Sequence, residues 1–299
     1  MNIKRYIATI ILAIVLLLNF SCTDWLDVKP VDRMSEDQLY STEAGFRQAL
    51  NGIYVELNHA DLYGDELLVN TVEILAQRYK FSSMGTLTNQ YHLAEFDYTT
   101  DYAKKCGSRI WEKAYALIAN VNKLLKNADS HKDLFTGDSY DLITGEAYAL
   151  RAFLHFDLVR LFGWGNLAKK PENLEKLCMP YMTKYDKVLT KQLTVGEVLA
   201  HIEEDLLASI ELLNNSDPYG LAPKSDDYDL PNEDKFFDNR EKRFNYWAAV
   251  CTLTRVYMWM GRKREALPLA TSFIDKGGRT SWIDSYTIDA YYEKDRDLT

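Results

Sequence analysis

The spacing of apolar residues constrains the fold of this chain more than any other feature. Apolar residues recur every three or four positions along six segments, which places them on one face of an α-helix, and no segment shows the sustained alternation of a β-strand. One segment also begins with a capping box, in which Thr194 precedes Glu197 by three residues. The expected helices cover residues 42–58, 108–128, 139–162, 194–213, 244–260 and 264–275. The sequence therefore predicts an all-α fold.

The last two expected helices carry the best evidence for how the helices pair. A short turn at Gly261 joins them, and the first contains the small pair Ala248-Ala249 followed by Tyr257, while Ala266-Leu267 begins the second. Small residues allow two helices to cross closely, and this order of residues looks like a tetratricopeptide unit. Helix pairs joined by short turns stack against their neighbours. We expect a tetratricopeptide-like helical-pair scaffold with irregular ligand-binding loops.

Two segments lack helical periodicity. Residues 217–238 hold three prolines among many acidic residues and are expected to form a long loop, whereas residues 59–107 are irregular and rich in tyrosine, with a short helix near 65–79. Binding residues concentrate on loops held by a rigid scaffold, and a tyrosine offers both a flat face and a hydroxyl. The candidate ligand-binding residues are Tyr98 and Tyr102, with Tyr91 behind them. Packing in the core is the alternative role of each.

The first residues resemble a lipoprotein signal peptide. Lys4 and Arg5 precede an unbroken apolar run at 7–18, which is too short for a permanent membrane-spanning helix. The small residue Ser21 then precedes Cys22, as in the site cleaved by lipoprotein signal peptidase, although Asn19 stands where an aliphatic residue is usual. We expect residues 1–21 to be removed, leaving 22–299 with acyl chains such as palmitate on Cys22. An ordinary secreted protein or an uncleaved anchor are the alternatives.

Composition and motifs argue against several classes of function. The formal net charge is -9 at pH 7 and no stretch is dense in lysine or arginine, so nucleic acid is not an expected partner. No catalytic motif appears, and His155 is expected to be a packed helix residue rather than a base. Clusters of cysteine and histidine are absent, so neither a metal nor a cofactor is expected. The acidic loop 226–234 could offer oxygen atoms to calcium but lacks the regular spacing of a calcium loop.

Cysteines and buried charges give further expectations. A disulfide between Cys106 and Cys178 could form in an oxidising compartment, but nothing in their spacing demands it, and Cys251 is expected to be a buried small apolar residue.

Glu146 and Arg151 lie five positions apart on one expected helix and therefore do not face each other. A structural role, pairing each with a neighbouring helix, is expected for both in preference to ligand contact.

Three segments, in this order, resemble the SusD/RagB family of outer-membrane lipoproteins. The first is Cys-Thr-Asp-Trp-Leu-Asp-Val-Lys-Pro at 22–30, which is similar to the family's mature start. The second, at 145–163, contains Glu-Ala, then Leu-Arg-Ala, an aromatic-rich helix end and a glycine. The third, at 245–257, begins Asn-Tyr-Trp-Ala-Ala. The resemblance extends over residues 22–278. Family members usually continue well beyond this length, so a truncated chain or a short variant is expected.

The resemblance implies a function without catalysis. It implies a surface-exposed lipoprotein, anchored in the outer membrane, that binds oligosaccharide or polysaccharide nutrients. Such a protein sits as a lid on a TonB-dependent, SusC-like transporter and delivers its ligand to that barrel. A peptide-binding member of the same family is one alternative, and a tetratricopeptide-type adaptor that binds proteins without glycan is another. A secreted hydrolase is the third, and it would need a carboxylate pair that the sequence does not identify.

Overall fold

The computed structural model describes residues 35–83 and 85–276, and the chain divides into two units, 1–39 and 40–299. In the first unit the described residues form the single turn α2 (Glu36–Leu39). There the backbone N–H of Ser35 donates to the side chain of Gln38, and the N–H of Gln38 donates to the hydroxyl of Ser35. All the helices discussed below belong to the second unit.

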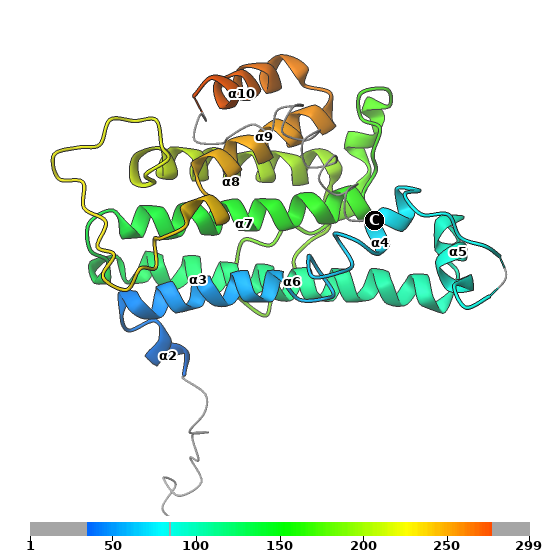
Figure 1. Cartoon of the computed structure of the whole chain (residues 1–299), viewed down its shortest axis with the longest axis horizontal. Helices are drawn as coiled ribbons and strands as arrows, with labels where there is room; N and C mark the ends of the chain where they lie inside the picture. Colours follow the sequence, from blue (N-terminus) through cyan, green and yellow to red (C-terminus); the bar gives the residue numbers. More distant parts are fainter. Residues whose placement is uncertain (1–34, 84, 277–299) are drawn as a thin grey trace, which may run out of the picture. The chain divides into compact units, whose positions relative to one another are not determined.

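Six long helices build the described part of the second unit. Figure 1 shows them as adjacent rows, and each packs against the next. They are α3 (Glu43–Leu57), α6 (Asp101–Ser130), α7 (Ser139–Phe162), α8 (Val195–Ser216), α9 (Tyr246–Met260) and α10 (Lys263–Lys276). The pairs α7 with α8 and α9 with α10 make the most extensive contacts. The predicted all-α, tetratricopeptide-like scaffold is confirmed.

Local capping explains several helix ends. The hydroxyl of Thr42 accepts a hydrogen bond from the N–H of Gly45 at the start of α3, and Thr194 and Glu197 form the expected capping box at the start of α8. Gly261 ends α9 at a φ of +79°, where a side chain would also approach Ala168 closely. These three helix ends lie within a few residues of the ends predicted from the sequence. The two glycines expected to close α10 lie outside the described residues.

Helix α6 begins seven residues before its predicted start, so the expectation of an irregular segment up to residue 107 was wrong. The hydroxyl of Thr100 accepts from the N–H of Ala103 and caps the helix. The added turns bury Ala103 and Cys106, whose small side chains give only a weak apolar period. The rest of the irregular segment contains two short helices, α4 (Thr71–Leu75) and α5 (Thr88–Ala94).

Extended structure is confined, within the described residues, to one small sheet. Strand β1 (Leu177–Met179) pairs antiparallel with β2 (Leu193–Thr194), and Leu177 lies opposite Thr194. The predicted loop after α8 is confirmed, because residues 217–239 contain neither helix nor strand. Short 3-10 helices lie at η2 (Lys132–Leu134), η3 (Pro171–Glu175) and η4 (Arg240–Lys242).

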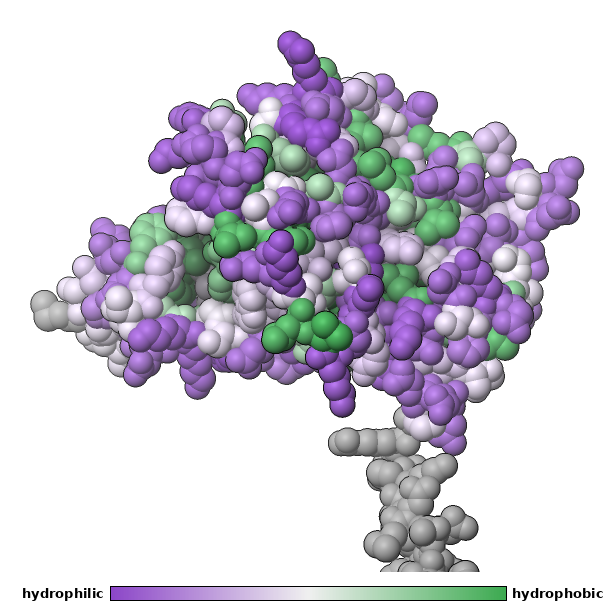
Figure 2. Space-filling model, turned by 180° about the vertical axis from the view of Figure 1, so that it is seen from behind, coloured by the Kyte–Doolittle hydropathy of each residue, from purple (hydrophilic) through white to green (hydrophobic). Residues whose placement is uncertain are grey.

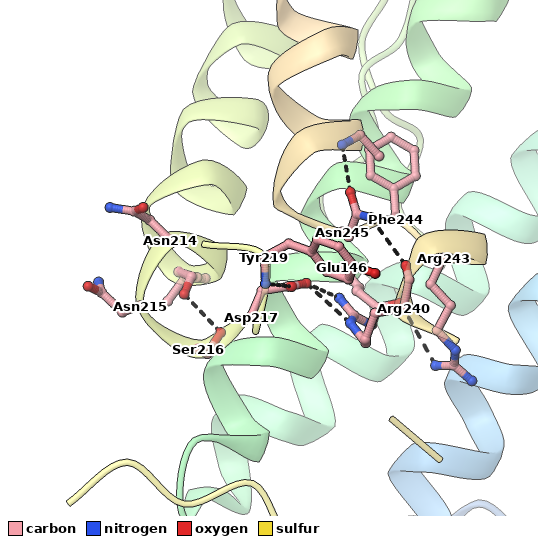
Figure 3. Close-up of polar contacts among 12 residues, drawn as sticks. Glu146, Asn214, Asn215, Ser216, Asp217, Tyr219, Arg240, Arg243, Phe244 and Asn245 are labelled. Atoms are coloured by element: carbon pink, nitrogen blue, oxygen red, sulfur yellow. Dashed lines mark hydrogen bonds and ion pairs between the residues drawn. The ribbon is translucent and has the colours of Figure 1, made fainter. Parts of the chain in front are cut away.

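A buried ion network attaches this long loop to the helices (Figure 3). Arg240 lies between the carboxylates of Glu146 on α7 and Asp217 at the end of α8, and both carboxylates are fully buried. The hydroxyl of Tyr54 on α3 donates to the second oxygen of Glu146 at 2.5 Å. Burial opposes the charge of Arg240, but the two carboxylates outweigh burial and raise its pKa. Arg240 and the hydrogen bond from Tyr54 to Glu146 therefore join three helices and the loop.

Replacing Arg240 with methionine should destabilise the protein strongly. The substitution leaves Glu146 and Asp217 buried without their cation, which costs about 3–5 kcal/mol for a broken buried pair. The free energy of unfolding, obtained from chemical denaturation, measures this loss.

Arg262 provides a matched control, because it also bridges two carboxylates, those of Glu203 and Glu265. Its side chain is 33% exposed, compared with 3% for Arg240. Arg262→Met should cost about 1 kcal/mol or less, as exposed ion pairs do. Equal losses for the two variants would contradict the anchoring role of Arg240.

Candidate functional site

The candidate site is a hollow of about 630 Å³ between α6, the end of α7 and the short helices α4 and α5. We call it the aromatic hollow, because Tyr98, Trp111 and Phe162 line it. Figure 2 shows hydrophobic residues gathered around a recess on the side of the molecule where α5 and the start of α6 lie. Concave, largely apolar sites with a few polar groups are where small ligands usually bind.

The three rings come from separate parts of the chain. Tyr98 precedes α6 and is 57% exposed, Trp111 lies on α6, and Phe162 ends α7 and is 40% exposed. The rings of Trp111 and Phe162 meet edge to face, with centroids 5.2 Å apart and an interplanar angle of 88°. That contact holds two of the rings against each other, while Tyr98 lines the same hollow as an exposed ring. The exposed parts of Tyr98 and Phe162 are thus available to a ligand.

Polar groups lie next to these rings on the same face of α6. Lys104, Ser108 and Glu112 recur at four-residue spacing, are exposed, and line the hollow. They offer an ammonium, a hydroxyl and a carboxylate, which can donate to or accept from ligand hydroxyls. The arrangement suits non-covalent binding of a ligand that has both apolar faces and hydroxyl edges.

The structure brings one of the three predicted tyrosines to this hollow. Tyr98 lines it, as stated above. Tyr102 instead packs against the apolar cluster that contains Ile74 and Leu93, and burial, together with the neighbouring Cys106, raises the pKa of its hydroxyl to about 12. Tyr91 lies half-buried on α5 with its ring edge-on to a histidine. Ligand contact by any of them stays a prediction.

Sequence reasoning missed Trp111 and Phe162 as site residues. Both lie within expected helices, where an aromatic ring is most simply part of the core. The available signal was the position of Trp111, which lies one residue beyond Ile110 and therefore to the side of the buried stripe that Ile110 and Ala114 share. A large ring at the edge of a buried stripe is a candidate for the wall of a groove.

The buried charges of α7 have structural roles, as predicted. Arg151 donates through Nε and Nη2 to the two carboxylate oxygens of Asp205, each at 2.6 Å, and through Nη1 to the amide oxygen of Asn122 at 2.9 Å. Glu146 pairs with Arg240 instead of Arg151. These residues join α7 to α6, α8 and the long loop, and both side chains are buried.

His155 is a packed residue, as predicted. It is fully buried, its Nδ1 bonds the carbonyl of Arg151 at 2.8 Å, and its Nε2 accepts from the N–H of Met182 at 3.1 Å. The second bond requires Nε2 to be unprotonated, so the ring proton is on Nδ1. Burial, with the charge of Arg151, lowers the pKa of His155 to about 3. The ring is thus neutral and not accessible to a substrate.

The cysteines do not form the disulfide that their sequence allowed. Cys106, Cys178 and Cys251 are all free thiols, and Cys251 is half-buried rather than buried as expected. Burial raises the pKa of the Cys178 thiol to about 11 and so disfavours the reactive thiolate. Cys22 lies outside the described residues.

The usual metal-binding side chains do not cluster in the part of the chain that the structure describes. No group of three or more histidine, cysteine, aspartate or glutamate side chains there could hold a metal ion. In the acidic loop, Asp234 pairs with Arg47 at 2.6 Å.

Within residues 35–83 and 85–276, no helix has the length and apolar character needed to cross a bilayer.

Comparison with known proteins decides the family. Residues 24–225 match the model of a SusD-like family described as starch-binding and associating with the outer membrane. The chain belongs to this SusD-like family. Among curated relatives, SusD-like protein P2 of Formosa agariphila is 28% identical over 160 residues, which is 54% of this chain and 30% of that protein. SusD-like protein P25 of the same organism is 27% identical over 57% of this chain and 33% of its own length.

Solved structures share the fold. A SusD superfamily protein from Bacteroides thetaiotaomicron has a TM-score of 0.59 at 22% identity, over 82% of this chain and 48% of that protein. A SusD-like carbohydrate binding protein from Bacteroides vulgatus has a TM-score of 0.60 at 19% identity, over 82% of this chain and 47% of that protein. The chain thus spans about a third of the length of the curated SusD-like relatives and about half of these solved proteins.

The buried neutral His155 should make stability depend on pH. The unfolded chain binds a proton at this residue below about pH 6.5, whereas the folded chain does so only near pH 3. The free energy of unfolding should therefore fall as pH is lowered between these values, by up to about 1.4 kcal/mol per pH unit from this residue.

Comparison with His155→Gln isolates this contribution, because the carboxylates of the protein titrate in both variants. Denaturant titrations at pH 7.5, 6, 5 and 4 should show a difference in stability between wild type and variant that shrinks as pH falls. A difference that stays constant with pH would contradict a buried, neutral His155.

Proposed function

We propose that this SusD-like protein captures oligosaccharides in the aromatic hollow. The observation that carries the proposal is the convergence of Tyr98, Trp111 and Phe162, from three separate parts of the chain, on one hollow of about 630 Å³. Sugar rings have apolar faces that stack on aromatic rings, and their hydroxyl edges would meet Lys104 and Glu112. The family description as starch-binding supports a glycan as the ligand.

Binding in this proposal involves no covalent step. The fixed rings of Trp111 and Phe162 form a preorganised floor, so ordering the ligand against them costs little side-chain entropy. Tyr98, which is exposed, offers the sugar a second flat surface. The similar solved protein from Bacteroides vulgatus is itself described as carbohydrate binding. The family match and the absence of a catalytic motif from the sequence support a binding protein rather than an enzyme.

We further propose that the captured glycan passes to a TonB-dependent, SusC-like outer-membrane transporter. In this proposal residues 1–21 are removed as a signal peptide, and the mature domain 22–299 is held at the cell surface by acyl chains on Cys22. Each buried methylene contributes about 0.8 kcal/mol, so several acyl chains anchor a protein stably. The sequence around Cys22 and the family's association with the outer membrane support this arrangement.

Tyr98→Ala should weaken oligosaccharide binding about tenfold, because truncating a central aromatic contact commonly costs more than 1 kcal/mol. The measurement is calorimetric titration of the full chain with a panel of neutral oligosaccharides that begins with maltoheptaose. Peptides of similar size form a second panel.

Tyr185→Ala is the matched control, because Tyr185 is also an exposed tyrosine but lies on the loop between β1 and β2, outside the aromatic hollow. The Tyr185→Ala variant should bind the same oligosaccharide with the affinity of the wild type. Binding of peptides alone, or an equal loss for the two variants, would contradict glycan capture at this hollow.

Detergent extraction of the native protein from its own membranes, followed by affinity purification and mass spectrometry, tests the proposed partner. A large TonB-dependent β-barrel should be retained with the protein, and the intact mass should report cleavage before Cys22 and acylation. Recovery of the protein alone or with periplasmic proteins would refute the transporter proposal while leaving glycan binding to the titrations above.

A further inference from the structure

A second hollow, of about 520 Å³, lies between α3 and the loop that Arg240 anchors. We call it the cationic hollow. Its charged lining consists of Arg47, Asp234, Lys235, Asp238, Lys242 and Arg243. Four cations therefore face two carboxylates, in a chain whose overall net charge is -9. The local charge is opposite in sign to that of the whole protein, which favours a negatively charged ligand.

The cations of this hollow differ in how completely they are paired. Arg47 is neutralised, because it donates to Glu43 and, at 2.6 Å, to Asp234. Lys235 and Lys242 are exposed, and within the described chain their ammonium groups form neither an ion pair nor a hydrogen bond. Two cationic groups at the rim are thus available to a ligand.

Arg243 is held in place but incompletely paired. Its guanidinium lies over the ring of Phe236 at 4.1 Å from the centroid, and its Nη2 donates to the amide oxygen of Asn51. Its Nη1 has no hydrogen-bond partner and is 3.9 Å from the nearest oxygen of Glu146. Arg47 flanks the same ring of Phe236 at 5.5 Å. Two guanidinium groups are therefore fixed beside one aromatic ring, and that of Arg243 keeps capacity to pair with an anion.

The backbone around Phe236 is held in a conformation that few side chains adopt. Lys235 and Asn239 have φ values of 58° and 54°, in the left-handed region that favours glycine. Such residues persist only when surrounding structure fixes them, and they concentrate at binding sites. Here the buried pair of Arg240 with Asp217, immediately after the strained residues, supplies that constraint.

Neutral donors complete the hollow. The amide oxygen of Asn51 accepts from Arg243, which leaves the Asn51 NH₂ group to donate, and the side chain of Asn239 lines the same space. Fixed amide donors beside lysine and arginine are the groups that bind carboxylate and sulfate oxygens. We propose that the cationic hollow binds an oxyanion, namely the carboxylate or sulfate group of an acidic sugar. This site is separate from the aromatic hollow and does not depend on sugar binding there.

The test is a titration of the full chain with glucuronate, glucose 6-sulfate and neutral glucose. NMR monitors the binding of each sugar at low and at high salt. At least one anionic sugar should bind more tightly than glucose, and salt should weaken that binding. If both bind, the hollow recognises the oxyanion charge; if one binds, it identifies the ligand as carboxylate or sulfate. Equal affinities for the anionic sugars and glucose, or no binding of any, would overturn the proposal.

Two double variants of equal charge locate the site. Lys235→Gln with Lys242→Gln removes the two unpaired rim cations without breaking a side-chain hydrogen bond or ion pair, and should weaken anion binding about 5–30-fold, as loss of two exposed charge contacts would. Lys187→Gln with Lys191→Gln removes two exposed lysines of the loop between β1 and β2, outside the hollow. The second variant should bind like the wild type. An equal loss in both variants would show an effect of net charge alone and contradict the site.

Failure of this proposal is distinguishable from failure of glycan capture at the aromatic hollow. The double lysine variant should leave binding of neutral oligosaccharides unchanged, and Tyr98→Ala should leave anion binding unchanged. Loss of anion binding in Tyr98→Ala, with retention in the lysine variant, would assign the anion to the aromatic hollow and overturn the cationic site.

Discussion

The long loop of this protein depends on one buried cation. Arg240 satisfies two fully buried carboxylates, Glu146 and Asp217, which would otherwise lose their closest counter-charge at a cost of several kcal/mol. The interaction fixes residues far apart in sequence and turns an irregular, proline-containing loop into a defined wall of the protein. The position of Phe236 and Arg243, and hence the cationic hollow, follows from that attachment.

The aromatic hollow depends on a different constraint, the packing of α7 against α6. These two helices contact each other directly, and the buried ion pair of Arg151 with Asp205 joins α7 to α8 as well. Trp111 and Phe162 meet where α6 and α7 lie side by side. The helical scaffold thus supplies a rigid floor, whereas Tyr98 comes from the connection between α5 and α6. Loops held by rigid helices are a common basis for ligand binding.

Much of the fold could be predicted from local sequence, because helix periodicity and caps such as Thr194 with Glu197 are local. Prediction failed where the local signal was weak, as at the start of α6, where Ala103 is too small to mark a strong apolar face. The site was harder to predict, because Trp111 belongs to a helix whose rings usually enter the core. The pairing of Arg240 with Glu146 joins residues 94 positions apart, and only tertiary packing brings such residues together.

The most direct test of glycan capture is a crystal structure of the chain with the oligosaccharide that it binds most tightly in the neutral panel. A sugar ring stacked against Tyr98 and Trp111, with its hydroxyls near Lys104 and Glu112, is the predicted result. Oligosaccharide bound elsewhere, with the aromatic hollow free of sugar in a complex formed at saturating ligand, would contradict the account.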